Sequence, residues 1–335
     1  MKQNHNLFIV KTPLQIINSI EAIDHFKLQN DFNTIIVIQS KETSDNDKQM
    51  QKIISLYKWD DTIYVTGKLS YFTYISLIKQ LQKQEYNYMF FARFGSIQRL
   101  IIANTTKKDL YYFDDGTETI TMYNGFLLPN KVNKFNSRQL ARVRFMLAGL
   151  KINITDTINL FTYFDLEPFQ NTKVVNNNLS YFREKYLKVN TTDDTIYLLG
   201  QPLIEKKLLP EDIYINSIKN IINSTSQNII YIPHKGEDKN SKVLSLESTQ
   251  FSILPISIPI ELYFLENKIE PKHLISFFTT AFFTLKLFYP KTKFQAIYFN
   301  SNLILQKAKI IESHYKFIKD IGIEYIDYSK KKEEK

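Results

Sequence analysis

The stretch Asn228-Ile-Ile-Tyr-Ile-Pro-His-Lys-Gly-Glu-Asp238 joins a short apolar run to a polar turn. Residues 229–232 predict a buried strand, and Pro233 ends it because proline cannot donate to a central strand ladder. His234 then lies at the mouth of the strand, where open α/β sheets place their ligand sites. Lys235 adds a positive charge and the following glycine permits close backbone approach, so a phosphate-bearing group fits there. The simpler alternative is a histidine that only caps a strand.

Strand and helix patterns alternate on both sides of this stretch, which is typical of doubly wound α/β domains. The expected strands are residues 7–10, 34–38, 62–65, 88–91, 110–113, 196–199, 229–232, 273–277, 294–299 and 324–326. The first expected helix begins at Thr12 and Pro13, a good N-cap and a good first helical residue. The other expected helices are 45–56, 70–83, 96–103, 212–222, 259–267, 280–288 and 309–319. We therefore predict a GT-B type of fold, in which two Rossmann-like domains face a central cleft.

The alternation loosens between residues 117 and 190, a region that includes a basic helix expected at 137–150. The polar run 190–194 is the expected domain boundary. We predict an acceptor-side domain over residues 1–190, a nucleotide-sugar domain over 191–329 and a charged tail over 330–335.

The composition excludes several classes of site. With 335 residues, of which 44% are hydrophobic, the chain can form two ordinary cores. It has no cysteine, and its five histidines are not paired at metal-ligand spacing, so we expect no disulfide, no metal and no cofactor. There is no signal-peptide pattern and no run of about 20 apolar residues, and we expect a cytoplasmic protein.

The charge of the chain bears on its partners. The formal net charge is +9, and the lysines are spread along the sequence. A basic stripe or a known module would indicate nucleic-acid binding, and because neither is present we expect no nucleic-acid partner. A basic surface can also attract an acidic substrate or anionic membrane lipids. Dinucleotide, Walker, G-x-S-x-G and kinase motifs are all missing, which excludes those classes.

Two adjacent carboxylates, Asp114 and Asp115, follow an apolar strand and precede Gly116. In a cleft, one of them could accept a proton from a sugar hydroxyl. One alternative is an ordinary Asp-Gly turn. A metal-binding pair is a weaker alternative, because no further carboxylates cluster nearby in the sequence.

A second polar group follows the strand expected at 196–199. Gly200 would let a ligand approach, Gln201 offers an amide, and Glu205 could reach the cleft. The alternative is a plain strand-to-helix turn with a solvated glutamate.

Two further candidate sites lie at expected helix starts. Ser276 is followed by Thr279 and Thr280, whose hydroxyls could hold an anion together with the free N–H groups of the helix. Ordinary N-capping by these threonines is the alternative. Glu261, beside Pro259, could hold ribose hydroxyls, or it could simply place a negative charge at the positive end of a helix.

The order of several short motifs resembles glycosyltransferase family 52, which contains bacterial lipooligosaccharide and capsule sialyltransferases. The motifs are TPLQ (12–15), FDDGT (113–117), LLGQP (198–202), Pro-His (233–234) and SFFTTA (276–281). Each is short, and their order and spacing carry the resemblance, which runs from residue 7 to about 299.

The resemblance implies a metal-independent, inverting enzyme with a GT-B fold. It places the acceptor on the N-terminal half and the donor, CMP-sialic acid, on the C-terminal half, with His234 at the donor phosphate. On the donor side we expect Gly200, Gln201, Pro233, Lys235, Glu261, Ser276, Thr279 and Thr280. On the acceptor side we expect Thr12, Gln15, Gly116 and Thr117.

Two departures from the family pattern affect the catalytic base. The residue after the histidine is often proline in such enzymes, and here it is Lys235. Some members carry an aspartate directly after the Gly-x-Pro turn, where this chain has Leu203. Glu205 is the nearest acid to that position, and we place the base there, with Asp114 and Asp115 as the alternative.

The expected function is transfer of sialic acid from CMP-sialic acid to a terminal galactoside of a surface glycan, with an α-2,3 linkage. One alternative is a relative that uses another nucleotide sugar, such as a glucosyltransferase. Another is a non-catalytic protein of glycan assembly. The oligomeric state stays open, and a homodimer is one option.

Overall fold

The computed structural model describes residues 3–39, 45–66, 70–116, 118–133, 144–186, 191–238, 241–279 and 281–327. The chain divides into two units, Met1–Glu184 and Lys185–Lys335, and each is described by itself. This division falls a few residues before the expected boundary at 190. The expected tail at 330–335 lies outside the described residues, as does the first half of the basic helix expected at 137–150, residues 137–143.

Unit 1 is built on a seven-stranded parallel sheet with the order β3-β2-β1-β4-β5-β6-β7. Its strands are β1 (His5–Val10), β2 (Phe32–Gln39), β3 (Asp61–Thr66), β4 (Glu85–Phe91), β5 (Thr106–Phe113), β6 (Ile158–Thr162) and β7 (Val174–Asn176). The strand order reverses direction between β1 and β4. In open α/β sheets, ligands bind beyond the carboxyl ends of the strands at such a reversal.

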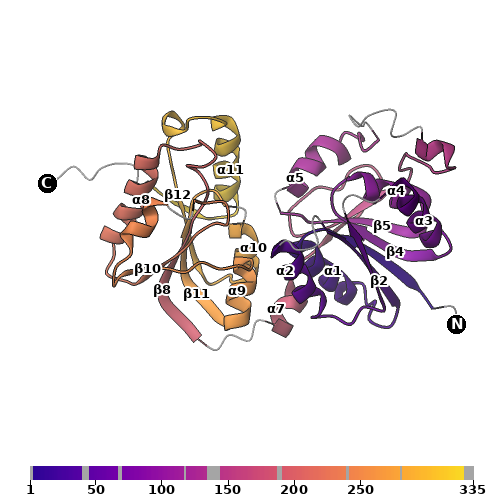
Figure 1. The fold of residues 1–335 in the computed structure, drawn as a ribbon, viewed down its shortest axis with the longest axis horizontal. Coiled ribbons are helices and arrows are strands. Elements are labelled where there is room, and N and C mark those ends of the chain that lie inside the picture. The colour runs from indigo at the N-terminus through magenta and orange to yellow at the C-terminus, as the bar shows by residue number, and fades with distance from the viewer. Residues whose placement is uncertain are drawn as a thin grey trace. The chain divides into compact units, whose positions relative to one another are not determined.

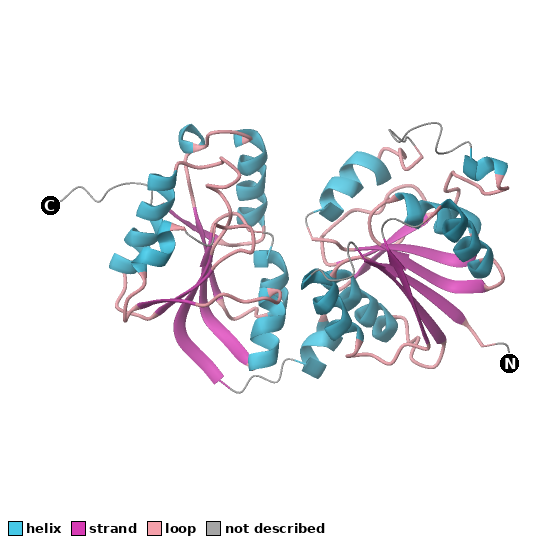
Figure 2. Ribbon diagram, in the orientation of Figure 1, coloured by secondary structure: helices cyan, strands magenta, loops and turns pink. Residues whose placement is uncertain are grey.

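The helices of unit 1 cover both faces of this sheet (Figures 1 and 2). They are α1 (Pro13–His25), α2 (Asp45–Ile54), α3 (Tyr71–Leu81), α4 (Ser96–Asn104), α5 (Glu118–Met122) and α7 (Ser180–Tyr186). Helices α1 and α2 lie on one face, and α3 and α4 lie on the other (Figure 1). Because both faces are covered, β1 and β2 are nearly continuous buried apolar runs, as parallel strands usually are.

The tryptophan of unit 1, Trp59, lies on the loop between α2 and β3. Its ring meets Phe8 of β1 edge-on, with 5.4 Å between centroids, and packs at 4.9 Å against Tyr57. Phe8 in turn stacks on Phe90 of β4 at 5.0 Å. Trp59 is therefore part of the aromatic packing on one face of the first sheet.

Unit 2 repeats the same winding in a six-stranded parallel sheet with the order β10-β9-β8-β11-β12-β13. Its strands are β8 (Thr191–Leu199), β9 (Ile229–Ile232), β10 (Phe251–Ile253), β11 (Ile269–Ser276), β12 (Lys293–Ile297) and β13 (Glu324–Ile326). Its helices are α8 (Glu211–Asn223), α9 (Ile260–Asn267), α10 (Ala281–Phe288) and α11 (Ala308–Asp320). Here the order reverses between β8 and β11.

The predicted alternation is confirmed in both units, and two differences stand out. Strands β6, β7 and β10 and helices α5 and α7 were not predicted, because they are short and carry little periodicity. The run 190–194, predicted to be a polar boundary, is largely the start of β8, since Thr191 pairs with Ile269 of β11. Threonine suits a strand well, so polarity was a poor guide there.

Candidate functional site

The loops that follow β8, β9 and β11 meet at the carboxyl edge of the second sheet. Gln201 follows β8, and its side-chain oxygen accepts the N–H of Phe278, which follows β11, at 3.2 Å. This hydrogen bond crosses the point where the strand order reverses. His234 follows the neighbouring strand β9, as predicted, after a half-buried Pro233. The geometry thus forms a site where nucleotide-binding sheets usually hold a ligand.

His234 is exposed, and its own turn fixes its tautomer. Its Nδ1 accepts the backbone N–H of Gly236 at 3.0 Å, so Nε2 carries the proton of the neutral ring. Desolvation lowers the pKa of His234, the charges of Lys206 and Lys235 lower it further, and Glu205 acts in the opposite direction. Near neutral pH the neutral ring therefore carries its proton on Nε2 and can donate it in a hydrogen bond.

Glu237 is a residue of this site that the sequence analysis missed. One of its oxygens accepts the backbone N–H of His234 at 2.7 Å, and the other accepts the hydroxyl of Tyr231. The hydroxyls of Tyr231 and Tyr214 lie 3.0 Å apart, and Tyr214 also accepts the N–H of Gln201 at 3.1 Å. Burial raises the pKa of Glu237 to about 7. This chain of hydrogen bonds joins the turn of His234 to the loop after β8.

Gly200 has a different role from the one predicted. A Cβ atom there would lie 2.2 Å from a carboxylate oxygen of Glu237 and 2.3 Å from the hydroxyl of Tyr231. The space above this glycine is therefore filled by the protein itself. The prediction that Gly200 lets a ligand approach is wrong on this face, since the glycine makes room for the network that holds His234.

Glu205 is exposed and lies in the same neighbourhood as His234. One of its carboxylate oxygens accepts the backbone N–H of Asp238 at 2.7 Å, which ties its loop to the turn after β9. It is close enough to raise the proton affinity of His234. The structure therefore brings together the predicted base and the predicted phosphate-binding histidine within unit 2.

The other predicted donor residues are mostly engaged in local structure. Ser276 is fully buried and donates to the carbonyl of Leu199 at 2.8 Å, so the prediction that it contacts a ligand is wrong. Thr279 accepts the N–H of Ala281 at 3.2 Å, which is the predicted capping alternative. Because it acts there as an acceptor, its hydroxyl hydrogen stays available for a ligand. Thr280 lies outside the described residues.

Glu261 lies in the first turn of α9, as expected, but its carboxylate is directed at the protein. It accepts the hydroxyl of Thr284 on α10, and burial raises its pKa. The contact joins α9 to α10, the helices on either side of β11 in the sequence. We find no support here for the predicted contact with ribose hydroxyls.

In unit 1, Asp114 is fully buried at the carboxyl end of β5. Its two oxygens accept the hydroxyl of Thr162 at 2.7 Å and the N–H of Tyr163 at 2.8 Å. Its backbone carbonyl accepts the amide of Asn18 at 2.8 Å. Burial raises its pKa to about 7. The prediction that Asp114 acts on a substrate is wrong, because no part of its side chain is exposed.

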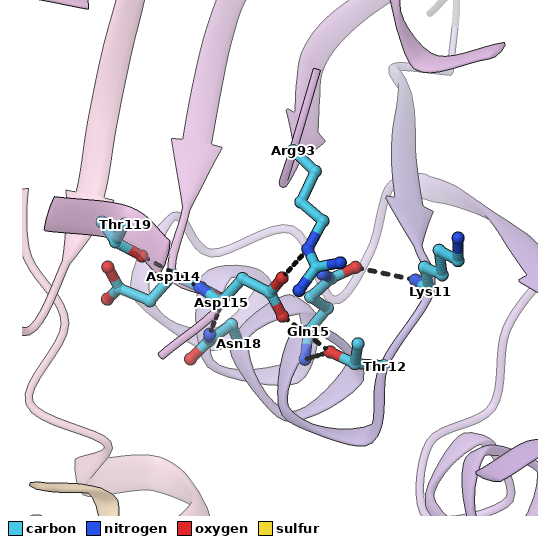
Figure 3. Close-up of polar contacts among 8 residues, drawn as sticks. All are labelled: Lys11, Thr12, Gln15, Asn18, Arg93, Asp114, Asp115 and Thr119. Carbon is cyan, nitrogen blue, oxygen red and sulfur yellow. Dashed lines mark hydrogen bonds and ion pairs between the residues drawn. The ribbon is translucent and has the colours of Figure 1, made fainter. Parts of the chain in front are cut away.

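Asp115 lies beside Asp114 but faces a different set of partners (Figure 3). It accepts the hydroxyl of Thr12 at 3.1 Å and forms an ion pair with Nε of Arg93. Its own N–H donates to the hydroxyl of Thr119 at 3.0 Å. The sequence analysis did not include Arg93 among the site residues. An arginine just after an apolar strand could have marked it as a candidate. Figure 3 shows Asp115 reaching from the end of β5 toward Arg93, which follows β4.

Of the predicted acceptor residues, Thr12 contacts Asp115 directly, and the others have different surroundings. Thr12 caps α1 as predicted, since its hydroxyl accepts the N–H of Gln15 at 3.4 Å. Gln15 is fully buried, and its side-chain oxygen accepts the N–H of Lys11 at 2.7 Å. Gly116 has a φ of 65°, a left-handed conformation that favours glycine in this turn. Thr117 lies outside the described residues.

Metal binding and membrane insertion were also considered from the side chains and helices that the structure describes. Over the residues described, no group of three or more histidines and carboxylates could hold a metal ion. In the same part of the chain, no helix has the length and apolar character needed to cross a bilayer.

Comparison with known proteins defines the class of fold. No family model matches the chain, and no curated protein matches it. Its structure is similar to UDP-GlcNAc 2-epimerase from Methanocaldococcus jannaschii, with a TM-score of 0.56 and 14% identity over 97% of this chain and 89% of the epimerase. It also matches MurG from Acinetobacter baumannii, with a TM-score of 0.47 and 10% identity over 98% and 87% of the two chains. The likeness to the epimerase confirms the predicted GT-B type of fold and, at this identity, shows the fold alone.

Proposed function

We propose that this protein is an inverting glycosyltransferase that uses CMP-sialic acid as donor and a terminal galactoside of a surface glycan as acceptor. The coarser part of the proposal is a nucleotide-sugar enzyme. The finer part, a sialyltransferase forming an α-2,3 linkage in lipooligosaccharide or capsule, rests on the ordered motifs of the sequence. We further propose that it acts in the cytoplasm, where its basic surface favours contact with an anionic membrane.

The observation that carries the proposal is the fixed imidazole of His234. Its ring carries the proton on Nε2 and feels the positive charges of Lys206 and Lys235, one strand away from the reversal of the strand order. A donor with a single phosphate needs a hydrogen-bond donor and positive charge at its bridging oxygen, and this arrangement supplies both. Thr279 offers a further hydroxyl from the loop after β11.

The proposed reaction is one displacement at the anomeric carbon of sialic acid. The galactoside oxygen forms a bond to C2 while the bond from C2 to the phosphate oxygen breaks, and CMP leaves with the electron pair. A carboxylate accepts the proton of the attacking hydroxyl. Negative charge grows on the phosphate in the transition state, so the hydrogen bond from His234 strengthens as the bond breaks.

We assign the proton acceptor to Glu205, with Asp115 as the alternative. Glu205 is exposed, and only one of its oxygens is used, by the N–H of Asp238. Asp115 has both oxygens engaged, by Thr12 and by Arg93. Both oxygens of Asp115 are thus occupied by donors of the protein, whereas Glu205 keeps one oxygen for the proton of a substrate, which favours Glu205.

The test is binding and turnover with matched nucleotides. CMP should raise the melting temperature and UDP should not, because a ligand stabilises the folded state that it binds. CMP-sialic acid with a galactoside should release CMP, and His234→Ala should nearly abolish that release. His273→Gln is the matched control, since His273 lies in β11 and bonds Gln295 within the sheet.

Stabilisation by UDP and not by CMP would reject CMP-sialic acid in favour of another nucleotide sugar. Stabilisation by CMP without turnover of the donor on any galactoside, in the wild-type protein, would favour a non-catalytic binding protein.

A further inference from the structure

Unit 1 contains a cavity of about 1060 Å³ at the carboxyl edge of its sheet. Its walls include Lys11 after β1, Thr66 at the end of β3, Arg93 after β4 and the first turn of α4. The cavity therefore lies at the reversal of the strand order between β1 and β4.

The walls of this cavity are positively charged. Lys11, Arg93 and Arg99 line it, and among the lining residues that the structure describes Glu118 is the one acidic residue. The Nε of Arg93 is paired with Asp115, and its side chain is 47% exposed. Within the described residues, neither Nη nitrogen of Arg93 makes a hydrogen bond. The Nη atoms of the Arg93 guanidinium thus stay available to a ligand.

Arg93 is also held in an uncommon backbone conformation. Its φ is 63°, in the left-handed region that residues other than glycine rarely adopt. Such a conformation costs about 1–3 kcal/mol and persists where the surrounding structure enforces it. The ion pair with Asp115 provides that constraint and fixes the direction of the guanidinium.

Helix α4 adds unpaired donors to the same cavity. Gly95 is its N-cap and provides no side-chain acceptor, so the helix start is uncapped. In the described part of the chain, the N–H groups of Ser96, Ile97 and Gln98 have no acceptor, although Ile97 and Gln98 are almost fully buried. Unpaired N–H groups at a helix start attract an anion.

A further donor without a partner in the described part of the chain lies one hydrogen bond away from Lys11, which lines this cavity. Gln15 is fully buried and holds the N–H of Lys11 with its oxygen, while its Nε2 has no partner among the residues described. Figure 3 draws Gln15 and Arg93 on the same side of Asp115. A buried donor without an acceptor is rare in proteins and calls for a group that the protein itself lacks.

We propose that this cavity binds the negatively charged group of an acceptor sugar, either a carboxylate or a phosphate ester. This inference rests on the proposed function and narrows its acceptor to an anionic galactoside. Arg93 and the first turn of α4 hold the charge. Phe94 and Phe126, which also line the cavity, provide apolar surface for the face of a sugar ring.

The test is a calorimetric titration of the full chain without any donor. Three matched sugars are used: methyl β-galactoside, which is neutral, galacturonic acid, which carries a carboxylate, and galactose 6-phosphate. At least one anionic sugar should bind about tenfold or more tightly than the neutral one, because charge-assisted hydrogen bonds are strong. The comparison between the two anionic sugars tells carboxylate from phosphate.

Two variants test the assigned donors. Arg93→Gln should weaken the anionic sugar about tenfold and leave the neutral sugar unchanged. Ser96→Glu places a carboxylate at the helix start, so it should abolish anion binding without lowering the melting temperature. Lys27→Gln is the control, because Lys27 is exposed in unit 1 and pairs with the nearby Asp24.

Equal binding of all three sugars would overturn the inference, as would anion binding that survives both variants. Loss of CMP affinity in Arg93→Gln, with sugar binding unchanged, would show that the cavity binds the nucleotide-sugar donor. That result would also overturn the inference. CMP binding is measured separately. If CMP binds normally and neither anionic sugar binds more tightly than the neutral one, this inference alone is rejected. Anion binding without CMP binding sinks the proposed function alone.

Discussion

The Nδ1 atom of His234 accepts the backbone N–H of Gly236 at 3.0 Å, and this bond decides which nitrogen faces a ligand. Protonation of Nδ1 would break the bond. The neighbouring lysines also oppose protonation, and desolvation of the ring opposes it further, so the pKa of His234 lies below its usual value. The imidazole is thus a neutral hydrogen-bond donor at neutral pH.

The first prediction concerns the part that His234 plays in turnover. His234→Ala should lower kcat for CMP release by about 10²–10⁴-fold and change the donor KM much less, because the Nε2–H bond strengthens in the transition state. Nitrogen NMR of the histidine rings should show the Nε2-protonated tautomer. An unchanged kcat would remove His234 from the mechanism, and an Nδ1-protonated ring would contradict the assigned geometry.

The second prediction separates the two candidate bases. Glu205→Gln should nearly abolish sialyl transfer and leave CMP binding intact, because the amide cannot accept the proton but still accepts the N–H of Asp238. Asp115→Asn should raise the acceptor KM more than it lowers kcat, since it weakens the contact with Arg93. Steady-state kinetics with both variants decides the matter. An active Glu205→Gln beside an Asp115→Asn with no measurable kcat would move the base to Asp115.

The third prediction concerns packing above Gly200. Gly200→Ala should destabilise the protein by about 1–3 kcal/mol or more, because the new methyl group would overlap the Tyr231 hydroxyl and the Glu237 carboxylate. Chemical denaturation measures the change. Gly125→Ala is the control, since nothing lies within 4 Å of its added Cβ. Equal stabilities of the two variants would refute the close packing seen at Gly200.

The fourth prediction is a pH dependence of stability that arises at Glu21 of α1. Burial raises its pKa from 4.5 to about 7, while its carboxylate accepts the N–H of Phe182. Between these values the folded state binds more protons than the unfolded state, so stability falls as pH rises. Glu21→Gln keeps the acceptor and loses this dependence, and near pH 8 it should be more stable by up to about 3 kcal/mol.

Thermal unfolding of wild type and Glu21→Gln at about pH 5 and about pH 8 checks this prediction. Glu247→Gln, at an exposed position, is the control. If the difference between Glu21→Gln and wild type is the same at both pH values, the carboxyl of Glu21 does not titrate in this range.

The fifth prediction concerns metal ions. Turnover should persist in EDTA, because the departing nucleotide carries one phosphate and the site provides His234, Lys206 and Lys235 to offset its charge. CMP release is measured with EDTA and then with added Mg²⁺ or Mn²⁺. Loss of turnover in EDTA that either ion restores would show that these side chains are insufficient.

Much of the fold could be predicted because buried parallel strands leave a strong signal in the sequence. Residues 229–232 match β9 at both ends, and the expected cap of α1 by Thr12 is present. Short elements such as β7 and β10 have three residues each, too few to show a period. Strand β8 begins in polar residues, so its start depends on pairing with β11 and not on local hydrophobicity.

The site was harder to predict because sequence shows which residues follow a strand but not where their side chains point. Asp114 and Asp115 are neighbours in the chain, yet one is buried against Thr162 and the other is paired with Arg93. Glu237 lies three residues after His234, and only the structure shows that its carboxylate holds the backbone of that histidine. Contacts between distant segments of the chain decide these outcomes.

The aromatic packing of Trp59 gives unit 1 its own spectroscopic label. Trp59 is the single tryptophan of the chain, and its neighbours Phe8 and Tyr57 both belong to unit 1. Its emission therefore follows the environment of the first sheet, whereas the tyrosines and the circular dichroism follow both sheets. With no native cysteine in the sequence, an introduced thiol in unit 2 would accept a dye without competing sites. Unfolding of each unit can thus be followed separately in one solution, by the emission of Trp59 and by the emission of the dye.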